Sequence, residues 1–278
     1  MPALVDLHLH TTASDGRLAP EELVRLLVER GVTVAAITDH DSTEGLRAAM
    51  LEAQRHPGFE LICGIELGAV LPAEDGDVHM LGYFLDIDNS AFQSSLMTFR
   101  DGRVERARGM VENLVRVGFQ IEWERVIELA QGGAIARPHI AWALVEKGYF
   151  QSVQEAFDRY LGDEGIAYVG RTKLTTEKAI NMIRSVGGVP VLAHPARYVS
   201  NLEKHLPMLK REGLAGMEVY YKDYTIEEVS WLQRLSYQYD LIPCGGTDYH
   251  AMESADEMLP GTIGPPMASI KRLKSLIS

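Results

Sequence analysis

Val5-Asp6-Leu7-His8-Leu9-His10 predicts a β-strand, and Thr11-Thr12-Ala13-Ser14-Asp15 predicts the loop that follows it. Side chains two positions apart in a strand point to the same side, so His8 and His10 project together. Asp15 returns toward them from the loop. Two imidazoles and a carboxylate at a strand end are suitable ligands for a divalent metal ion. The alternative is a chance pair of histidines near the N-terminus, and the rest of the chain decides between the two.

Length and composition indicate an ordinary soluble protein. The 278 residues fit one large domain, or one domain with an inserted piece. The net charge of −12 argues against non-specific nucleic-acid binding through a broad basic surface. No apolar run is long enough to span a bilayer, and no secretory signal is evident. Cys63 and Cys244 do not form a disulfide framework, and buried free thiols are expected. We therefore expect a cytoplasmic protein without membrane contact or an obligate protein partner.

Strands alternate with helices along most of the chain. This order predicts a mostly parallel sheet, and about seven strand–helix units favour a barrel over an open sheet. The fold class expected is α/β. Helices are predicted at 20–30, 43–56, 175–185, 202–211, 225–239 and 268–277, and further strands at 34–38, 60–67, 77–85, 189–193, 216–220 and 241–244.

One long helical stretch interrupts this alternation. Residues 90 to about 161 are almost wholly helical in pattern, which is too long for one strand-to-helix connection. We interpret residues 90–170 as a small inserted helical domain that binds the substrate. Residues 1–89 and 171–278 then form a metal-binding barrel.

Six of the nine histidines lie at or just after predicted strand ends, or inside the strand at 77–85. That edge of a parallel barrel is where active sites are built. Carboxylates gather at the same places, including Asp39 and Asp41 around His40, Glu66, Glu218 and Asp248. Any one of these motifs alone could be a capped turn or a buried histidine, but together they predict a site for several metal ions. The six histidines are His8, His10, His40, His79, His194 and His250.

These motifs resemble the PHP (polymerase and histidinol phosphatase) domain family, within the amidohydrolase group. The resemblance spans nearly the whole chain in the same order. It implies a distorted (β/α)7 barrel that holds two or three divalent ions, with Mn²⁺ expected and Fe²⁺ or Zn²⁺ as alternatives. The matching motifs are His8-x-His10, Thr38-Asp39-His40, Gly64-x-Glu66, His79, Ala193-His194-Pro195 and Thr247-Asp248-x-His250.

The resemblance also implies which residues hold each ion. His8, His10, Glu66 and Asp248 would hold the first. Asp15, His40 and His250 would hold the second. Glu66, His79 and His194 would hold the third, with Glu66 bridging. Asp248, His250 and His194 are the candidate catalytic residues, and the proton acceptor could be Asp248, His250 or bulk water.

The inserted helices offer candidates for substrate recognition. Arg137 and His139, in Ala136-Arg137-Pro138-His139, lie at the start of a predicted helix, where an arginine and a helix N-terminus together can hold a phosphate. Arg197 follows His194 closely and could reach the same cleft. The alternative is that Arg137 is a solvated loop residue and His139 a helix cap.

The layout looks like one bacterial branch of the family, which includes 3′,5′-nucleotide bisphosphate phosphatases and 5′→3′ exoribonucleases. The resemblance implies hydrolysis at the 3′ oxygen of a nucleotide gripped by its 5′-phosphate. Adenosine 3′,5′-bisphosphate would give AMP and phosphate, and short 5′-phosphorylated RNA or DNA would give mononucleotides. The alternatives are a histidinol-phosphate-type monoester phosphatase and a PHP module without catalysis.

Two further sets of side chains admit two interpretations each. Arg100, Arg103 and Arg106 recur every third residue of a predicted helix, which favours a solvated charged face over a path for a polynucleotide. Tyrosines that follow strand ends could stack on a base or pack at the rim of the core. They are Tyr198, Tyr220 and Tyr221.

Overall fold

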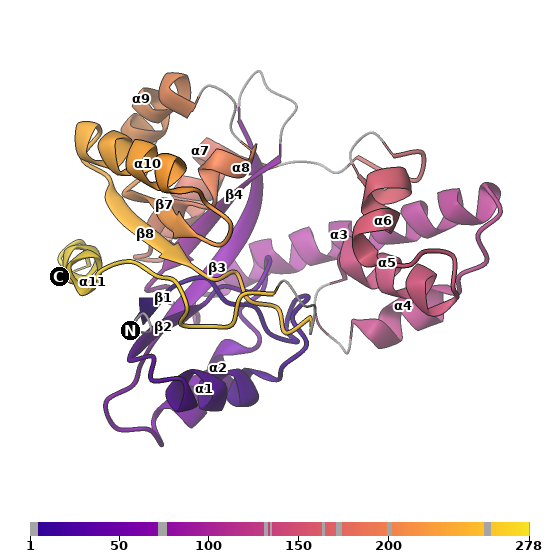
Figure 1. Ribbon diagram of the computed structural model, residues 1–278, viewed down its shortest axis with the longest axis horizontal. Coiled ribbons are helices and arrows are strands. Elements are labelled where there is room, and N and C mark those ends of the chain that lie inside the picture. The colour runs from indigo at the N-terminus through magenta and orange to yellow at the C-terminus, as the bar shows by residue number, and fades with distance from the viewer. Residues whose placement is uncertain are drawn as a thin grey trace.

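The computed structural model describes residues 5–71, 77–130, 133, 135–162, 165–170, 174–198, 202–252 and 257–277. Seven strands form a barrel-shaped sheet on one side of the molecule, and a group of helices extends from it on the other side (Figure 1). The strands of the barrel are β1 Val5–Asp6, β2 Val34–Ile37, β3 Glu60–Val70, β4 Asp77–Tyr83, β6 Val189–Leu192, β7 Gly216–Tyr221 and β8 Ile242–Gly246.

The strand order is β1-β2-β3-β4-β6-β7-β8, with the short β5 (Leu174–Thr175) paired to β3. The edge strands approach each other, because Leu9 bridges Tyr249 and the Leu7 amide donates to the Gly245 carbonyl at 3.2 Å. All pairs are parallel except those of β4, which is antiparallel to β3 and to β6. The expected α/β barrel is confirmed, and β4 is its reversed strand.

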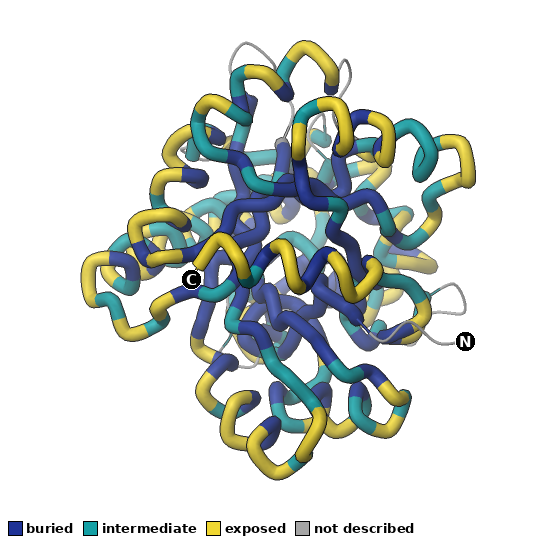
Figure 2. The backbone as a smooth tube through the Cα atoms, turned by 90° about the vertical axis from the view of Figure 1, so that its left-hand side faces the viewer, coloured by how far each residue is buried: buried dark blue, intermediate teal, exposed yellow. Residues whose placement is uncertain are grey.

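Helices cover the outside of the barrel and close one end of it. Apolar residues of α1, α2, α7, α9 and α10 pack on the strands. Helix α11 contributes Ile270 and Leu273 to a cluster at the N-terminal strand ends, and Figure 2 shows α11 lying across the dark blue, buried strands. The opposite end of the barrel is left for the polar residues. The bounds are α1 Pro20–Glu29, α2 Leu46–Ala53, α7 Thr176–Ser185, α8 Pro195–Tyr198, α9 Leu202–Glu212, α10 Ile226–Gln238 and α11 Met267–Lys274.

The remaining helices have a core of their own. Helix α3 starts against the barrel, where Phe92 and Leu96 are buried, and ends in a second apolar cluster that includes Met110 and Leu114. The other helices of this group pack around that end of α3 (Figure 1). The division into domains at residues 90 and 170 stays an interpretation. These elements are α3 Ser90–Arg116, α4 Trp123–Leu129, α5 Arg137–Glu146, α6 Val153–Ala156 and the π-helical η1 Phe157–Leu161.

The first strand is shorter than predicted. The regular part of the first strand ends at Asp6, and only Leu9 continues it as an isolated bridge. His8 and His10 nevertheless project to one side, since both approach the same oxygen of Glu66.

Within the described residues, no helix is both long enough and apolar enough to cross a membrane.

Candidate metal centre

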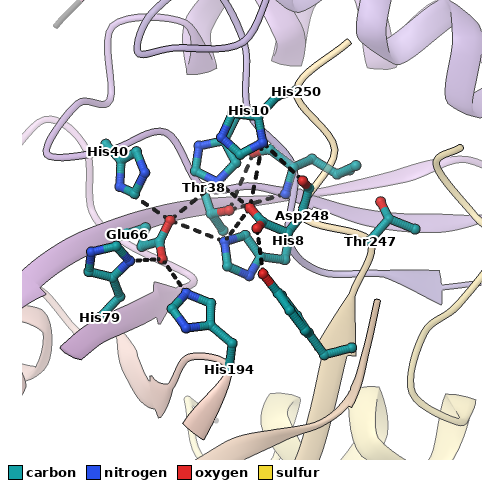
Figure 3. A network of polar contacts seen from close by, with 12 residues as sticks. His8, His10, Thr38, His40, Glu66, His79, His194, Thr247, Asp248 and His250 are labelled. Atoms are coloured by element: carbon teal, nitrogen blue, oxygen red, sulfur yellow. Dashed lines mark hydrogen bonds and ion pairs between the residues drawn. The ribbon is translucent and has the colours of Figure 1, made fainter. Parts of the chain in front are cut away.

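Glu66 lies at the middle of the polar end of the barrel. Its Oε2 is 3.1 Å from His8 Nε2, 3.2 Å from His10 Nε2 and 3.2 Å from His40 Nδ1. Its Oε1 is 2.7 Å from His79 Nδ1 and 3.1 Å from His194 Nε2. Figure 3 shows these five imidazoles pointing at the one carboxylate. We use the name histidine–carboxylate cluster for the nine residues His8, His10, Asp15, His40, Glu66, His79, His194, Asp248 and His250.

The other two carboxylates of the cluster extend it to either side. Asp248 Oδ1 is 3.1 Å from His10 Nε2 and 3.4 Å from His8 Nε2. Asp15 Oδ1 is 3.3 Å from His250 Nε2, and its Oδ2 is 3.8 Å from His40 Nε2. The structure thus brings all nine predicted ligands together, although His79 comes from the start of the reversed strand β4.

The donor atoms fit divalent metal ions. Among the residues that the structure describes, three groups have ligand atoms within 4.8 Å of one another: His8, His10, Glu66 and Asp248; His10, Asp15, His40 and His250; and His40, Glu66 and His79. His10 Nε2, His40 Nδ1 and His79 Nδ1 are buried close to carboxylates without hydrogen-bond geometry. Buried nitrogens normally have partners, so atoms aimed at a shared point in this way are suited to coordination. Imidazole and carboxylate ligands suit Zn²⁺, Fe²⁺ and Mn²⁺.

The first and second groups contain the sets that the family resemblance implies, with His10 added to the second. In the third group His40 stands where His194 was expected, while His194 lies on the same Glu66 oxygen as His79. The assignment of ligands to individual ions stays a proposal.

Neighbouring groups inside the cluster shift one another's pKa values. Burial lowers the pKa of His10, but Asp248 and Glu66 outweigh it and raise the pKa to about 10. Burial also lowers the pKa of His40, here to about 3, so this ring is neutral. Burial raises the pKa of Asp15, Glu66 and Asp248, yet the surrounding imidazoles, and Lys222 in the case of Asp248, hold each pKa well below its ordinary value. The cluster therefore keeps its three carboxylates ionised.

A fourth carboxylate, Glu218 of β7, lies behind two of the ligands. Both of its oxygens are 3.1 Å from His8 Nδ1, and Oε2 accepts the His194 amide proton at 2.8 Å. A proton held on Nδ1 leaves the lone pair of His8 Nε2 facing Glu66 and Asp248. The sequence placed Glu218 at a strand end but gave it no role, because its partner His8 is 210 positions away.

Two more buried carboxylates hold the loops that carry ligands. Asp6 accepts hydrogen bonds from the Thr247 amide at 3.0 Å, the Thr247 hydroxyl at 2.8 Å and the Gly261 amide at 2.9 Å. Asp39 accepts from the Thr11 amide and hydroxyl, both at 2.7 Å, and from the Ser14 hydroxyl at 2.5 Å. Asp6 thus fixes the loop of Asp248, and Asp39 fixes the loop of Asp15.

Asp248 is also held from its outer side. Its Oδ2 accepts the Tyr221 hydroxyl proton at 2.7 Å and lies 2.9 Å from Lys222 Nζ. Tyr221 is thus buried beside the cluster, as the packing alternative expects, and its hydroxyl also holds Asp248. The Tyr220 hydroxyl accepts from Gln233, and the Tyr198 side chain lies outside the described part of the chain.

The backbone is strained at two residues of the cluster and at a neighbour of a third. Asp41, His194 and Asp248 have positive φ of 49°, 30° and 50°, in a region that side chains other than glycine rarely adopt. Each such residue costs about 1–3 kcal/mol and persists only where surrounding contacts impose it. The hydrogen bond that the His194 amide donates to Glu218 and the two side-chain contacts of Asp248 are such contacts here.

The predicted phosphate-binding helix packs against the loop of Asp15. The Arg17 guanidinium lies 4.7 Å above the Trp142 ring of α5, and His139 lies edge-on to that ring at 4.9 Å. Arg137 is the first residue of α5, and its Nη1 donates to the Leu161 carbonyl at 3.3 Å. His139 Nδ1 accepts the Ala136 amide proton, and burial lowers its pKa, so the neutral ring carries its proton on Nε2.

Arginines of α8 and α3 lie near the cluster and the loops that carry its residues. Arg197 follows the cluster on α8, with Nη2 at 3.3 Å from Asp223 Oδ2. Arg103 on α3 is half-buried, and its Nε is 2.5 Å from Asp41 Oδ2. Arg100 pairs with Glu44, and Arg106 donates to the Val169 carbonyl. The face is therefore only partly solvated, as its three arginines are half-buried and contact neighbouring loops.

Proteins of similar sequence and structure have related activities. The 5′-3′ exoribonuclease Rnm of Salmonella typhimurium is 36% identical over 251 residues, which cover 89% of this chain and 85% of that protein. A 3′,5′-nucleoside bisphosphate phosphatase of Chromobacterium violaceum is 30% identical over 253 residues, 90% of this chain and 88% of that one. An amidohydrolase structure from Chromobacterium violaceum, with bound SO4 and no metal, has a TM-score of 0.88 at 28% identity and 97% coverage of both chains.

Both named relatives are hydrolases of phosphoester bonds, which confirms the predicted reaction class. Residues 6–165 match the PHP domain, which is more than half of the chain. The barrel-shaped sheet and the candidate metal-binding groups are consistent with this family match. The chain belongs to the PHP domain family.

Proposed function

We propose that this protein hydrolyses the phosphoester at the 3′ oxygen of nucleotides that carry a 5′-phosphate. The observation that supports this most is the contact between α5 and the loop of Asp15. Through this contact α5, which begins at Arg137, packs against the loop that carries one of the proposed metal ligands. Two anion-binding features side by side suit a substrate with two phosphates.

The N-terminus of α5 would hold the 5′-phosphate. Arg137 supplies a guanidinium, and the neutral His139 can donate from Nε2. Arg197, next to the cluster on α8, would reach the same phosphate from the other side. A 5′-phosphate fixed in this way positions the 3′ phosphoester over the cluster.

The cluster would hold two or three divalent ions, which we propose to be Mn²⁺, with Fe²⁺ or Zn²⁺ as alternatives. Such ions supply Lewis acidity, which activates water and offsets charge on phosphoryl oxygens. Glu66, Asp248 and Asp15 would be the anionic ligands, and the imidazoles around them the neutral ones. Glu218 keeps the lone pair of His8 directed into the cluster.

Hydrolysis joins the oxygen of water to phosphorus and breaks the bond from phosphorus to the 3′ oxygen, which takes up a proton. Asp248, His250 and His194 are the residues proposed to move these protons. Adenosine 3′,5′-bisphosphate would yield AMP and phosphate. A 5′-phosphorylated oligonucleotide would yield a mononucleotide and a shortened strand that again carries a 5′-phosphate, so that cleavage continues in the 5′→3′ direction.

A kinetic comparison with Mn²⁺ tests this proposal. The substrates are adenosine 3′,5′-bisphosphate, a 5′-phosphorylated trinucleotide and the same trinucleotide with a 5′-hydroxyl. We expect both phosphorylated substrates to react and the hydroxyl form to be inert. Equal turnover of the hydroxyl form would favour a general monoester or diester phosphatase. Inertness toward all three, with metal bound, would favour a module without catalysis. A cytoplasmic location stays a prediction.

A further inference from the structure

A groove of about 630 Å³ runs along α3, beside β3 and β5. Its apolar wall includes Phe99 and Leu174, and its inner wall includes Arg103 and Arg106. Phe99 packs partly on the barrel core and presents the rest of its surface to the groove. An aromatic ring beside cationic side chains occurs in sites that bind single-stranded nucleic acid, although Asp41, Asp101 and Glu105 also line this groove.

The groove comes close to the histidine–carboxylate cluster at Asp41. Asp41, which lines it, directly follows His40 and pairs with Arg103. Arg103 and Arg106 also line a small adjoining cavity that is bounded by Arg137. A chain of nucleotides whose 5′-phosphate lies at Arg137 and whose first phosphoester lies at the cluster can therefore continue into the groove.

Gly102 leaves open space where α3 borders the groove. It lies inside the 27-residue helix α3, where glycine is less favourable than alanine. No atom of the protein lies within 4 Å of the place where its Cβ would be, so packing does not require glycine here. The same is true of Gly170 on the facing segment. Two glycines without a packing reason in one groove allow close approach of a ligand to the backbone.

We propose that this groove binds the second nucleotide of a 5′-phosphorylated single strand. Its base would stack on Phe99, while Arg106 and Arg103 would provide positive charge for its backbone. Asp101 and Glu105 also line the groove and are exposed, which disfavours a long polynucleotide track and limits the subsite to a short segment. The subsite rests on the proposed function and gives the enzyme a preference for oligonucleotides over nucleotide bisphosphates.

The test compares kcat/KM for a 5′-phosphorylated trinucleotide with kcat/KM for adenosine 3′,5′-bisphosphate, both with Mn²⁺. Phe99→Leu keeps an apolar side chain against the core but removes the stacking ring. We expect the trinucleotide-to-bisphosphate ratio to fall about tenfold or more. Met97→Ala on the same helix is the control, since Met97 is 57% exposed and does not line the groove. It should leave the ratio unchanged.

Gly102→Ala separates ligand contact from damage to the fold. The substitution should raise the unfolding temperature, because alanine favours the helix. It should also lower the trinucleotide-to-bisphosphate ratio, because the methyl group enters the space reserved for the ligand. An unchanged ratio in both variants, or a wild type that cleaves the bisphosphate but no oligonucleotide, overturns the subsite. A wild type inert on both substrates overturns the proposed function and the subsite with it.

Discussion

Replacing Glu218 by glutamine should weaken one metal position without disrupting the barrel. Glu218 is fully buried, it accepts a hydrogen bond from the His194 amide, and its carboxylate at 3.1 Å favours a proton on His8 Nδ1. The glutamine amide has the same shape. It can keep the bond from His194, but it sets an NH2 group against His8 Nδ1 and removes the negative charge. His8 then loses its preference for the tautomer whose Nε2 lone pair faces Glu66.

The size of the effect follows from this geometry. Loss of a carboxylate that orients a ligating histidine typically costs about 10–100-fold in metal affinity, or about 1.4–2.8 kcal/mol. Only the group of His8, His10, Glu66 and Asp248 contains the affected ring. The group of His10, Asp15, His40 and His250 has no contact with Glu218 and should keep its affinity. Glu218→Gln should therefore shift one phase of a metal titration and leave another in place.

Titration of the metal-free protein with Mn²⁺ against a chelator of known affinity measures both phases. Glu227→Gln on the exposed surface of α10 is the matched control and should bind like the wild type. Urea unfolding without metal shows whether the variant remains folded. Wild-type affinity in every phase of a folded Glu218→Gln protein would refute the role assigned to this carboxylate.

Three further predictions address the substrate clamp, the catalytic carboxylate and proton release. Arg137→Ala should reduce the kcat/KM preference for 5′-phosphorylated over 5′-hydroxyl trinucleotide by about 1.5–3 kcal/mol, and an unchanged preference would exclude Arg137 from the clamp. Asp248→Asn should lower kcat by more than about 100-fold, measured at saturating Mn²⁺, since it removes an anionic ligand; near-normal turnover would contradict this. Metal must displace the proton of His10, whose pKa is raised to about 10, so calorimetry at pH 7 should give heats that depend on the ionisation enthalpy of the buffer. Buffer-independent heats would count against it.

The same pKa of His10 fixes a pH dependence in the metal-free protein. The folded-state pKa is raised from 6.5 to about 10, so the protonated ring contributes stability that is complete below pH 6.5. This contribution is lost as the pH rises from 6.5 toward 10. Metal affinity changes in the opposite direction, since coordination needs the neutral ring. Added metal should therefore stabilise the protein more strongly as the pH rises through this range.

The barrel and its ligand-bearing end could be predicted from the sequence, because each strand is marked by a short apolar run and each ligand by its place after that run. His40, His194 and Asp248 could be found in this way. The reversal of β4 could not, since a strand pattern has no direction. His79 belongs to the cluster only because that reversal brings the start of β4 to the same end as the finish of its neighbours.

Contacts between segments that are distant in the sequence also could not be predicted. Glu218 meets His8 across 210 positions, and Arg103 meets Asp41 across 62. No local motif distinguishes such a carboxylate from a surface one, or such an arginine from a solvated one. The periodicity of Arg100, Arg103 and Arg106 indicated a shared helix face correctly, but it could not show that this face packs beside the cluster.

The carboxylates that face away from the ligand atoms explain how the site can form before metal arrives. Burial raises the pKa of Asp6 to about 6 and also raises the pKa of Asp39, so keeping them ionised at neutral pH opposes folding. Both are retained where they accept several hydrogen bonds from the loops of Asp248 and Asp15. These two carboxylates therefore lower the stability of the fold but hold the loops in place. The loops are fixed by the protein alone, and a metal ion does not have to order them on binding. The strained backbone at His194 and Asp248 also costs stability, and it persists because neighbouring contacts determine the conformation there.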